Sequence, residues 1–77
     1  MMPCCIVRPV LRQTGPTYAQ AQRALRYLQG IHKSWRLQMR YDSELAEIIY
    51  YSSSASPNQL LAHLQAQFPG MEVQVFF

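Results

Sequence analysis

The alternation of residues between Trp35 and Tyr41 most constrains the fold of this chain. Large apolar side chains occupy every second position there, with arginine or glutamine between them. This period of two is typical of a strand with one buried face. A polar turn, Asp42–Glu44, follows, and the mostly apolar run Leu45–Ser52 comes next. We therefore predict a β-hairpin in the middle of the chain.

A helix and a strand are predicted to complete the C-terminal half. Ser56 has the residue type of a helix N-cap, and Pro57 suits the first helical position. The segment 68–70 contains the Pro and Gly that end a helix, and 71–77 is predicted to be the last strand. The predicted apolar stripe of this helix consists of Leu60, Leu61, Leu64 and Phe68.

The N-terminal half repeats this order of strand and helix. The run Cys4–Leu11 is mostly apolar and is predicted to be a strand. Because proline lacks an N–H donor, Pro9 should lie at a bulge or where the strand runs out of pairing. Thr17 is predicted to cap a helix, with Gln20 as its capping-box partner. Gly30 is predicted to follow the end of this helix.

The predicted element order is β-α-β-β-α-β, in a single domain that spans residues 1–77. Each β-α-β unit crosses over with a right hand, so both helices are expected on one face of the sheet. We therefore predict the α+β class, as a ferredoxin-like plait with one antiparallel sheet whose first and third strands are central. The expected core consists of Leu25, Leu28, Trp35, Leu37, Met39, Ile48, Tyr50, Leu61, Leu64, Phe68, Val73 and Val75.

The composition favours a folded domain with a covered surface. Charged residues make up 14% of the chain, against a usual share of about 25%. Such a low share argues against disorder and suggests that a partner or further protein covers part of the surface. The net charge of +3 comes from scattered arginines and is weak support for nucleic-acid binding.

The two cysteines, Cys4 and Cys5, are adjacent in the first predicted strand. Neighbouring strand side chains point to opposite faces, so we expect reduced thiols, which fit a cytoplasmic location. The chain contains no apolar run of about 18 residues, so no transmembrane segment is predicted. The segment 1–10 lacks a charged start followed by an apolar stretch, and is not predicted to be a signal peptide.

No residue pattern suited to catalysis is found, so we expect the protein not to be an enzyme and to bind no cofactor. The acids form no pair suited to acid–base work, and the serines of segment 52–56 lack a nucleophile motif. The chain has no glycine-rich phosphate loop. His32 and His63 lie far apart in sequence without further ligands nearby, and they are expected to be solvated rather than metal-bound.

The sheet face away from the helices is the candidate interaction face. Its predicted residues are Arg36, Gln38, Arg40, Glu47, Tyr51 and Gln74, with Ile49, Glu72 and Phe76 nearby. Arginines between aromatic residues can bind RNA by backbone contact and base stacking. The predicted third strand, however, lacks the glycine-containing signature of RNA-recognition motifs. A solvated or protein-binding face is therefore preferred.

A second surface could be mildly basic. Its residues are Arg12, Arg23, Arg26, Lys33, Arg36 and Arg40. A solvated face is the default interpretation, and contact with phosphate or acidic lipid is the alternative.

Two segments resemble the non-motor region of conjugation and type IV secretion ATP-binding proteins, in the HerA/FtsK-like class. They are the alanine-rich segment 19–32, and the segment 58–73, whose ending Phe68–Val73 carries the most specific likeness. The strand pair 35–39 and 47–51 fits the same pattern. The chain lacks Walker motifs, so the resemblance implies no ATPase residues here. It implies a role in subunit contacts or in docking to membrane-channel components.

We therefore predict a non-catalytic protein-interaction or assembly domain, with a conjugative or type IV secretion ATPase as the candidate parent protein. One alternative is a small nucleic-acid-binding plait that uses Arg8, Arg36, Arg40 and Tyr51. Another is a phage or plasmid regulator that binds a host protein. A protein partner or self-association is expected in the first case, and affinity that falls steeply with salt in the second.

Overall fold

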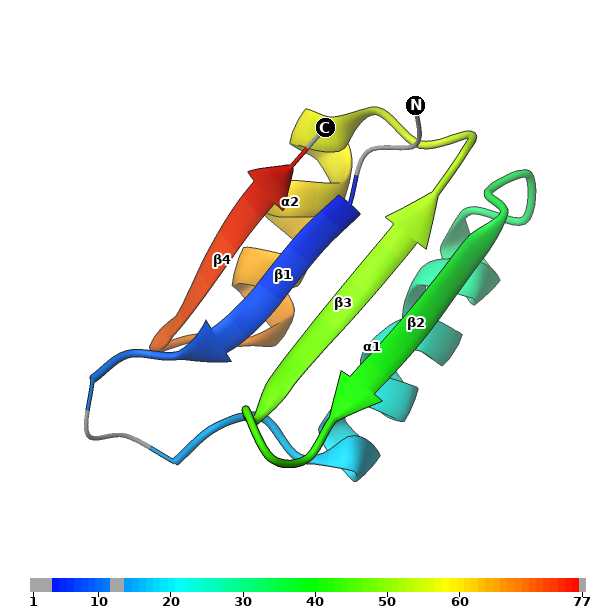
Figure 1. The fold of residues 1–77 in the computed structure, drawn as a ribbon. Helices are drawn as coiled ribbons and strands as arrows, with labels where there is room; N and C mark the ends of the chain where they lie inside the picture. The colour runs from blue at the N-terminus through cyan, green and yellow to red at the C-terminus, as the bar shows by residue number, and fades with distance from the viewer. Residues whose placement is uncertain (1–3, 12–13, 77) are drawn as a thin grey trace.

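The computed structural model describes residues 4–11 and 14–76. The domain belongs to the α+β class, with one four-stranded antiparallel sheet and two helices. In chain order the elements are β1 (Cys4–Pro9), α1 (Tyr18–Ile31), β2 (Leu37–Asp42), β3 (Glu47–Ser52), α2 (Pro57–Gln67) and β4 (Met71–Phe76). Both helices lie on the same side of the sheet, behind it in Figure 1, so the other side is open.

The strands are arranged in the order β2-β3-β1-β4. The first and third strands are thus central, as predicted, and β2 and β4 form the edges. The pairing β1–β3 ends at Val7, while β1–β4 continues to Pro9, the last residue of the strand. The strand therefore ends at Pro9 rather than at the predicted Leu11, and Pro9 lies where the strand runs out of pairing, one of the two expected positions.

Helix α1 begins as predicted and ends later than predicted. The Thr17 hydroxyl accepts a hydrogen bond from the Gln20 N–H at 3.2 Å, and the Gln20 side chain accepts one from the Thr17 N–H at 2.9 Å. This is the expected capping box. The prediction that Gly30 follows the helix was wrong, because the helix continues through it and His32 is the C-cap. Packing of α1 on the sheet outweighs the low helix propensity of a single glycine.

Helix α2 begins and ends where the sequence predicts. Ser56 is the N-cap and Pro57 the first helical residue, although the Ser56 side chain makes no capping hydrogen bond. The C-cap is Phe68, and the chain turns into β4 at Gly70, whose φ is +82°. A residue with a side chain would be strained at that φ, so glycine fits the turn.

The core lies between the sheet and the two helices. Its buried members are Cys5, Val7, Ala21, Ala24, Leu28, Leu37, Ile48, Tyr50, Leu60, Leu64 and Phe68. Leu60 is 1% exposed, whereas Leu61, which was expected in the core, only packs at its margin. Leu25, Trp35, Met39, Val73 and Val75 were also expected in the core and are partly buried. The sequence pattern identified the correct face of α2 but misjudged its centre by one position, about 100° of helical rotation.

No helix within segments 4–11 and 14–76 combines the length and apolar character needed to cross a membrane.

Candidate interaction face

The open face of the sheet is defined by the strand register. Alternate residues of each strand point to it, because their neighbours lie in the core. Three rows of paired residues cross it from β2 to β4. The rows are Gln38–Tyr51–Cys4–Phe76, then Arg40–Ile49–Ile6–Gln74, and finally Asp42 and Glu47 of the hairpin end with Arg8 and Glu72.

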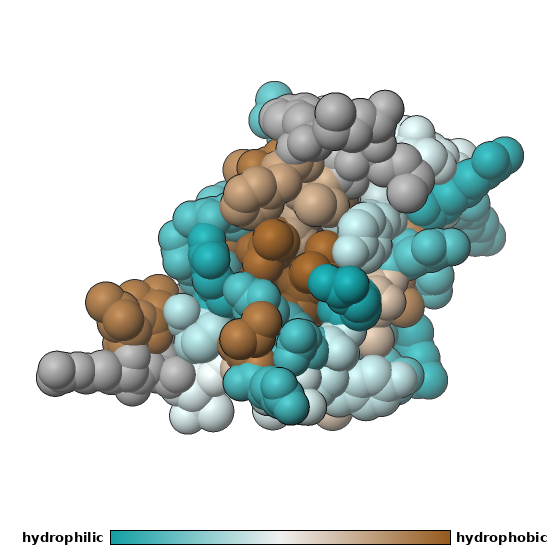
Figure 2. All heavy atoms as spheres, viewed as in Figure 1, coloured by the Kyte–Doolittle hydropathy of each residue, from teal (hydrophilic) through white to brown (hydrophobic). Residues whose placement is uncertain are grey.

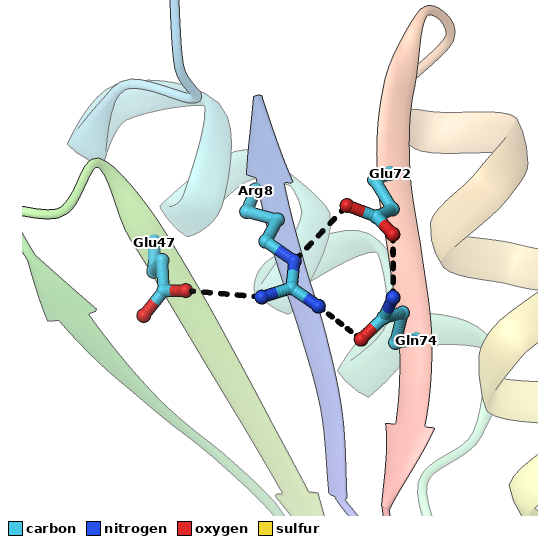
Figure 3. Close-up of polar contacts among 4 residues, drawn as sticks. All are labelled: Arg8, Glu47, Glu72 and Gln74. Carbon is cyan, nitrogen blue, oxygen red and sulfur yellow. Dashed lines mark hydrogen bonds and ion pairs between the residues drawn. The ribbon is translucent and has the colours of Figure 1, made fainter. Parts of the chain in front are cut away.

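Arg8 organises one end of this face, as Figure 3 shows. Its Nε donates to a Glu72 carboxylate oxygen at 3.1 Å, and a second guanidinium nitrogen donates to the Gln74 amide oxygen. A third nitrogen lies 3.9 Å from a Glu47 carboxylate oxygen, and the Gln74 amide donates to Glu72. One guanidinium therefore joins three strands. Half-exposed ion pairs contribute about 0–1 kcal/mol each, so this network fixes side-chain positions more than it adds stability.

Apolar side chains fill the middle of the face. We define the apolar band as Cys4, Ile6, Ile49, Tyr51 and Phe76, which lie next to one another in the first two rows. Phe76 is 44% exposed, and the other members are half-buried although no helix covers them. Figure 2 shows brown apolar spheres in the middle of this side of the molecule, with teal hydrophilic spheres around them.

The structure separates the six residues predicted for this face into four groups. Glu47 and Gln74 are bound to Arg8. Gln38 and Arg40 are on the edge strand β2, and Tyr51 belongs to the apolar band. Arg36 precedes β2 and is exposed at the end of the hairpin rather than on the sheet. The sequence did not predict that Arg8 would bind the acids beside it, since that requires the register of β1 with β4.

A second polar cluster was missed by sequence reasoning. The Nε2 atoms of His32 and His63 lie 3.1 Å apart, and the His32 ring stacks on Trp35 with centroids 3.6 Å apart and planes 6° from parallel. Both histidines are half-buried. The expectation of solvated histidines was therefore wrong. The two residues meet because the end of α1 lies beside the middle of α2, which no local pattern reveals.

Other polar residues singled out in the sequence have structural roles. The Asp42 carboxylate accepts hydrogen bonds from the N–H groups of Glu44 and Leu45 in the hairpin turn. The buried Ser52 hydroxyl accepts from the N–H groups of Ser54 and Ala55. These bonds hold two turns, so both side chains have a structural role.

The described residues of the predicted basic surface come from α1, the connection after it, and β2. Arg23 and Arg26 lie on α1, Lys33 follows that helix, and Arg12 lies outside the described residues. A cleft of about 220 Å³ between the helices is lined by Gln20, Arg23 and Gln67. This lining contains no nucleophile and no carboxylate.

Two buried groups have shifted pKa values. Burial, with a smaller effect of neighbouring Cys4, raises the pKa of the Cys5 thiol to about 11. Burial also raises the pKa of the Tyr50 hydroxyl well above its ordinary value. Both groups face the core in their neutral form, where the Tyr50 hydroxyl donates a hydrogen bond and the Cys5 thiol packs against apolar side chains. Neither group is therefore an activated nucleophile.

A comparison of the chain with protein-family models, curated proteins and solved structures found no match.

Proposed function

We propose that the chain is a non-catalytic protein-interaction domain of the ferredoxin-like class, and that it binds through the open face of its sheet. The element order and the central position of β1 and β3 support the fold assignment. The observation that supports the function is the apolar band, an uncovered group of apolar side chains in the centre of a sheet. Exposed apolar patches rimmed by polar residues mark interaction sites.

We propose a second copy of the chain as the occupant. Arg40 lies at the β2 edge of the face and Glu72 at the β4 edge. A two-fold axis parallel to the strands would place the β2 edge of one copy over the β4 edge of the other. The two apolar bands would then meet row on row. Arg40 of each copy would lie over Gln74 of its partner, and the exposed Glu72 would be two residues, about 6.8 Å, further along the strand.

The size of the face limits the strength of this association. Four strands about 4.8 Å apart, each six residues long at about 3.4 Å per residue, present roughly 400 Å² of projected area. Stable interfaces bury about 800 Å² per partner. We therefore propose a reversible dimer that dissociates on dilution, not an obligate one.

The test is sedimentation equilibrium over a wide concentration range. The wild type should show a reversible monomer–dimer equilibrium, and Ile49→Lys should abolish it by placing a charge in the apolar band. Leu45→Lys is the control, because Leu45 is 63% exposed in the hairpin turn, away from the band. A wild-type protein that stays monomeric at the highest concentrations would contradict the proposal.

A charge-reversal experiment tests the proposed symmetry. Arg40→Glu and Glu72→Arg should each weaken the dimer, and the double variant should restore it. Restoration of the dimer in the double variant would show that residues 40 and 72 lie close together across the interface.

The nucleic-acid alternative has less support, because Arg8, one of its four proposed residues, is bound to Glu47, Glu72 and Gln74. Fluorescence anisotropy with single-stranded RNA and DNA at low salt tests it directly. Binding that falls steeply with salt and is lost in Tyr51→Ala would favour that function over self-association. The proposed link to secretion ATPases stays a prediction, tested by whether the gene continues into a Walker A motif.

A further inference from the structure

His32 and His63 are held together by the packing of the two helices. His32 is the C-cap residue of α1, where its N–H donates to the Leu28 carbonyl oxygen at 2.9 Å, and His63 lies in the middle of α2. The Trp35 indole stacks on the His32 ring and lies edge-on to His63, with centroids 6.1 Å apart. The positions of both rings are therefore set by neighbours rather than by solvent.

The two ring nitrogens lie at hydrogen-bond distance, and the same distance also suits a shared metal ion. Two imidazole nitrogens that each lie about 2.0–2.1 Å from one metal, at angles between square and tetrahedral, are about 2.9–3.4 Å apart. The observed Nε2–Nε2 distance is 3.1 Å.

The orientation of the rings agrees with this spacing. At this separation, rings whose nitrogens point straight at each other have centroids about 5.4 Å apart, while rings directed at one metal have them about 4.8 Å apart. The observed centroid distance is 5.0 Å, and the planes are 65° apart. Only a small ring rotation would direct both nitrogens at a common point.

The surroundings also favour a cation. The C-terminal end of α1 carries a partial negative charge, which stabilises a positive ion beside its last residue. Neutral imidazole is a good ligand for Zn²⁺, Ni²⁺ and Cu²⁺, and Cu²⁺ has the highest affinity in this series. Lys33, the nearest charged residue in sequence, is exposed, so water screens its ammonium.

We propose that His32 and His63 bind one divalent transition-metal ion, of the Cu²⁺ or Zn²⁺ type, through their Nε2 atoms. Water completes the coordination, because segments 4–11 and 14–76 contain no group of three or more His, Cys, Asp or Glu side chains placed to hold a metal. A metal in this position links the end of α1 to α2. This site is independent of the open sheet face, which lies on the other side of the sheet.

Trp35 provides a direct readout, because it is the only tryptophan of the chain. Cu²⁺ or Ni²⁺ bound to His32 would lie close to the stacked indole and quench its fluorescence. The experiment titrates untagged, reduced wild-type protein with each metal at pH 7.5. We expect saturable quenching at one metal ion per chain.

Variants locate the site. His63→Gln should weaken metal binding by about tenfold or more, because one of two ligands is lost. Glu44→Gln is the control, because Glu44 is an exposed carboxylate in the hairpin turn, and this variant should bind like the wild type. Equal affinity in wild type and His63→Gln, or quenching that never saturates, would overturn the proposal.

A second measurement does not depend on fluorescence. Zn²⁺ should raise the melting temperature of the wild type, since a ligand that binds only the folded state stabilises it, and should leave that of His63→Gln unchanged. If His63→Gln folds poorly, His32→Gln gives the same answer. A Zn²⁺ effect that persists in either variant would count against the two imidazoles as ligands.

Discussion

The Tyr50 hydroxyl donates a hydrogen bond to the Ala21 carbonyl oxygen, 3.1 Å away, and both residues are fully buried. This bond links the central strand β3 to helix α1 and gives a buried phenol its partner. Ala21 lies within α1, so its carbonyl oxygen also has a helical partner one turn further on.

Tyr50→Phe is therefore expected to lower the free energy of unfolding by about 1 kcal/mol, since one hydrogen bond is lost without leaving an unsatisfied carbonyl. Urea denaturation followed by circular dichroism measures the change. Tyr27→Phe is the control, because Tyr27 is 49% exposed on α1. A loss equal to that of the control would show that the buried bond contributes nothing.

Gly15 lies against the hairpin turn and cannot accept a side chain. A Cβ there would overlap the Cβ of Ala46 and lie 2.9 Å from its carbonyl oxygen. Gly15→Ala should cost about 1–3 kcal/mol through overpacking. Gly30→Ala is the control, and it should have the opposite effect on stability. A Cβ at this helical position meets no atom within 4 Å, so the change should raise the free energy of unfolding by about 0.5–1 kcal/mol.

Ala46 itself has a φ of +51°, a conformation that costs a non-glycine residue about 1 kcal/mol. Ala46→Gly should relieve this strain, and it should also remove the Cβ that Gly15→Ala would otherwise overlap. A double-mutant cycle in thermal unfolding should therefore show Gly15→Ala to be less costly when residue 46 is glycine. Strict additivity would contradict the proposed contact.

The two neighbouring leucines of α2 provide a matched pair for the core. Leu60 is 1% exposed, and Leu61 lies at the core margin. Leu60→Ala should destabilise by about 2–4 kcal/mol, and Leu61→Ala by roughly half as much or less. Denaturant midpoints measured on both variants test this. A larger loss of stability in Leu61→Ala than in Leu60→Ala would contradict the rotation of α2 about its axis.

Cys4 and Cys5 should differ in reactivity because they point to opposite faces. Cys4 is half-buried on the open face, and Cys5 is 1% exposed in the core with its pKa raised to about 11. Ellman's reagent at pH 8 should modify Cys4 in the native protein, and Cys5 only after unfolding. Equal rates at both positions would contradict the register of β1.

The raised pKa of Cys5 also predicts alkaline destabilisation. The folded thiol keeps its proton up to about pH 11, whereas the unfolded thiol loses it near its ordinary value of 9.0. The neutral Cys5 thiol therefore contributes fully to the free energy of unfolding below pH 9. This contribution is lost as the pH rises towards 11, by roughly 1.4 kcal/mol per pH unit. Stability measured from pH 8 to 11 should fall less steeply in Cys5→Ala, after allowing for the cavity that this change creates.

Local sequence patterns predicted the elements and several of their ends. Thr17 with Gln20 indicated the start of α1, and Pro57 indicated the start of α2, because capping depends on residues within one turn. Gly30 misled the prediction, since helix ends also depend on packing against the sheet. The open face was predicted from alternation alone, but its division into the Arg8 network and the apolar band was not.

The sequence by itself determined the order of strands and helices and the buried faces of β2, β3 and β4, because these follow from periods of two and 3.6 residues. It did not indicate which face of the mostly apolar β1 is buried. The tertiary structure alone decided which distant side chains meet. Arg8 finds Glu72 through the register of β1 with β4, and His32 meets His63 through the packing of α1 beside α2. Both contacts join residues far apart in the chain, so their formation depends on the free energy of the whole fold and not on any local preference.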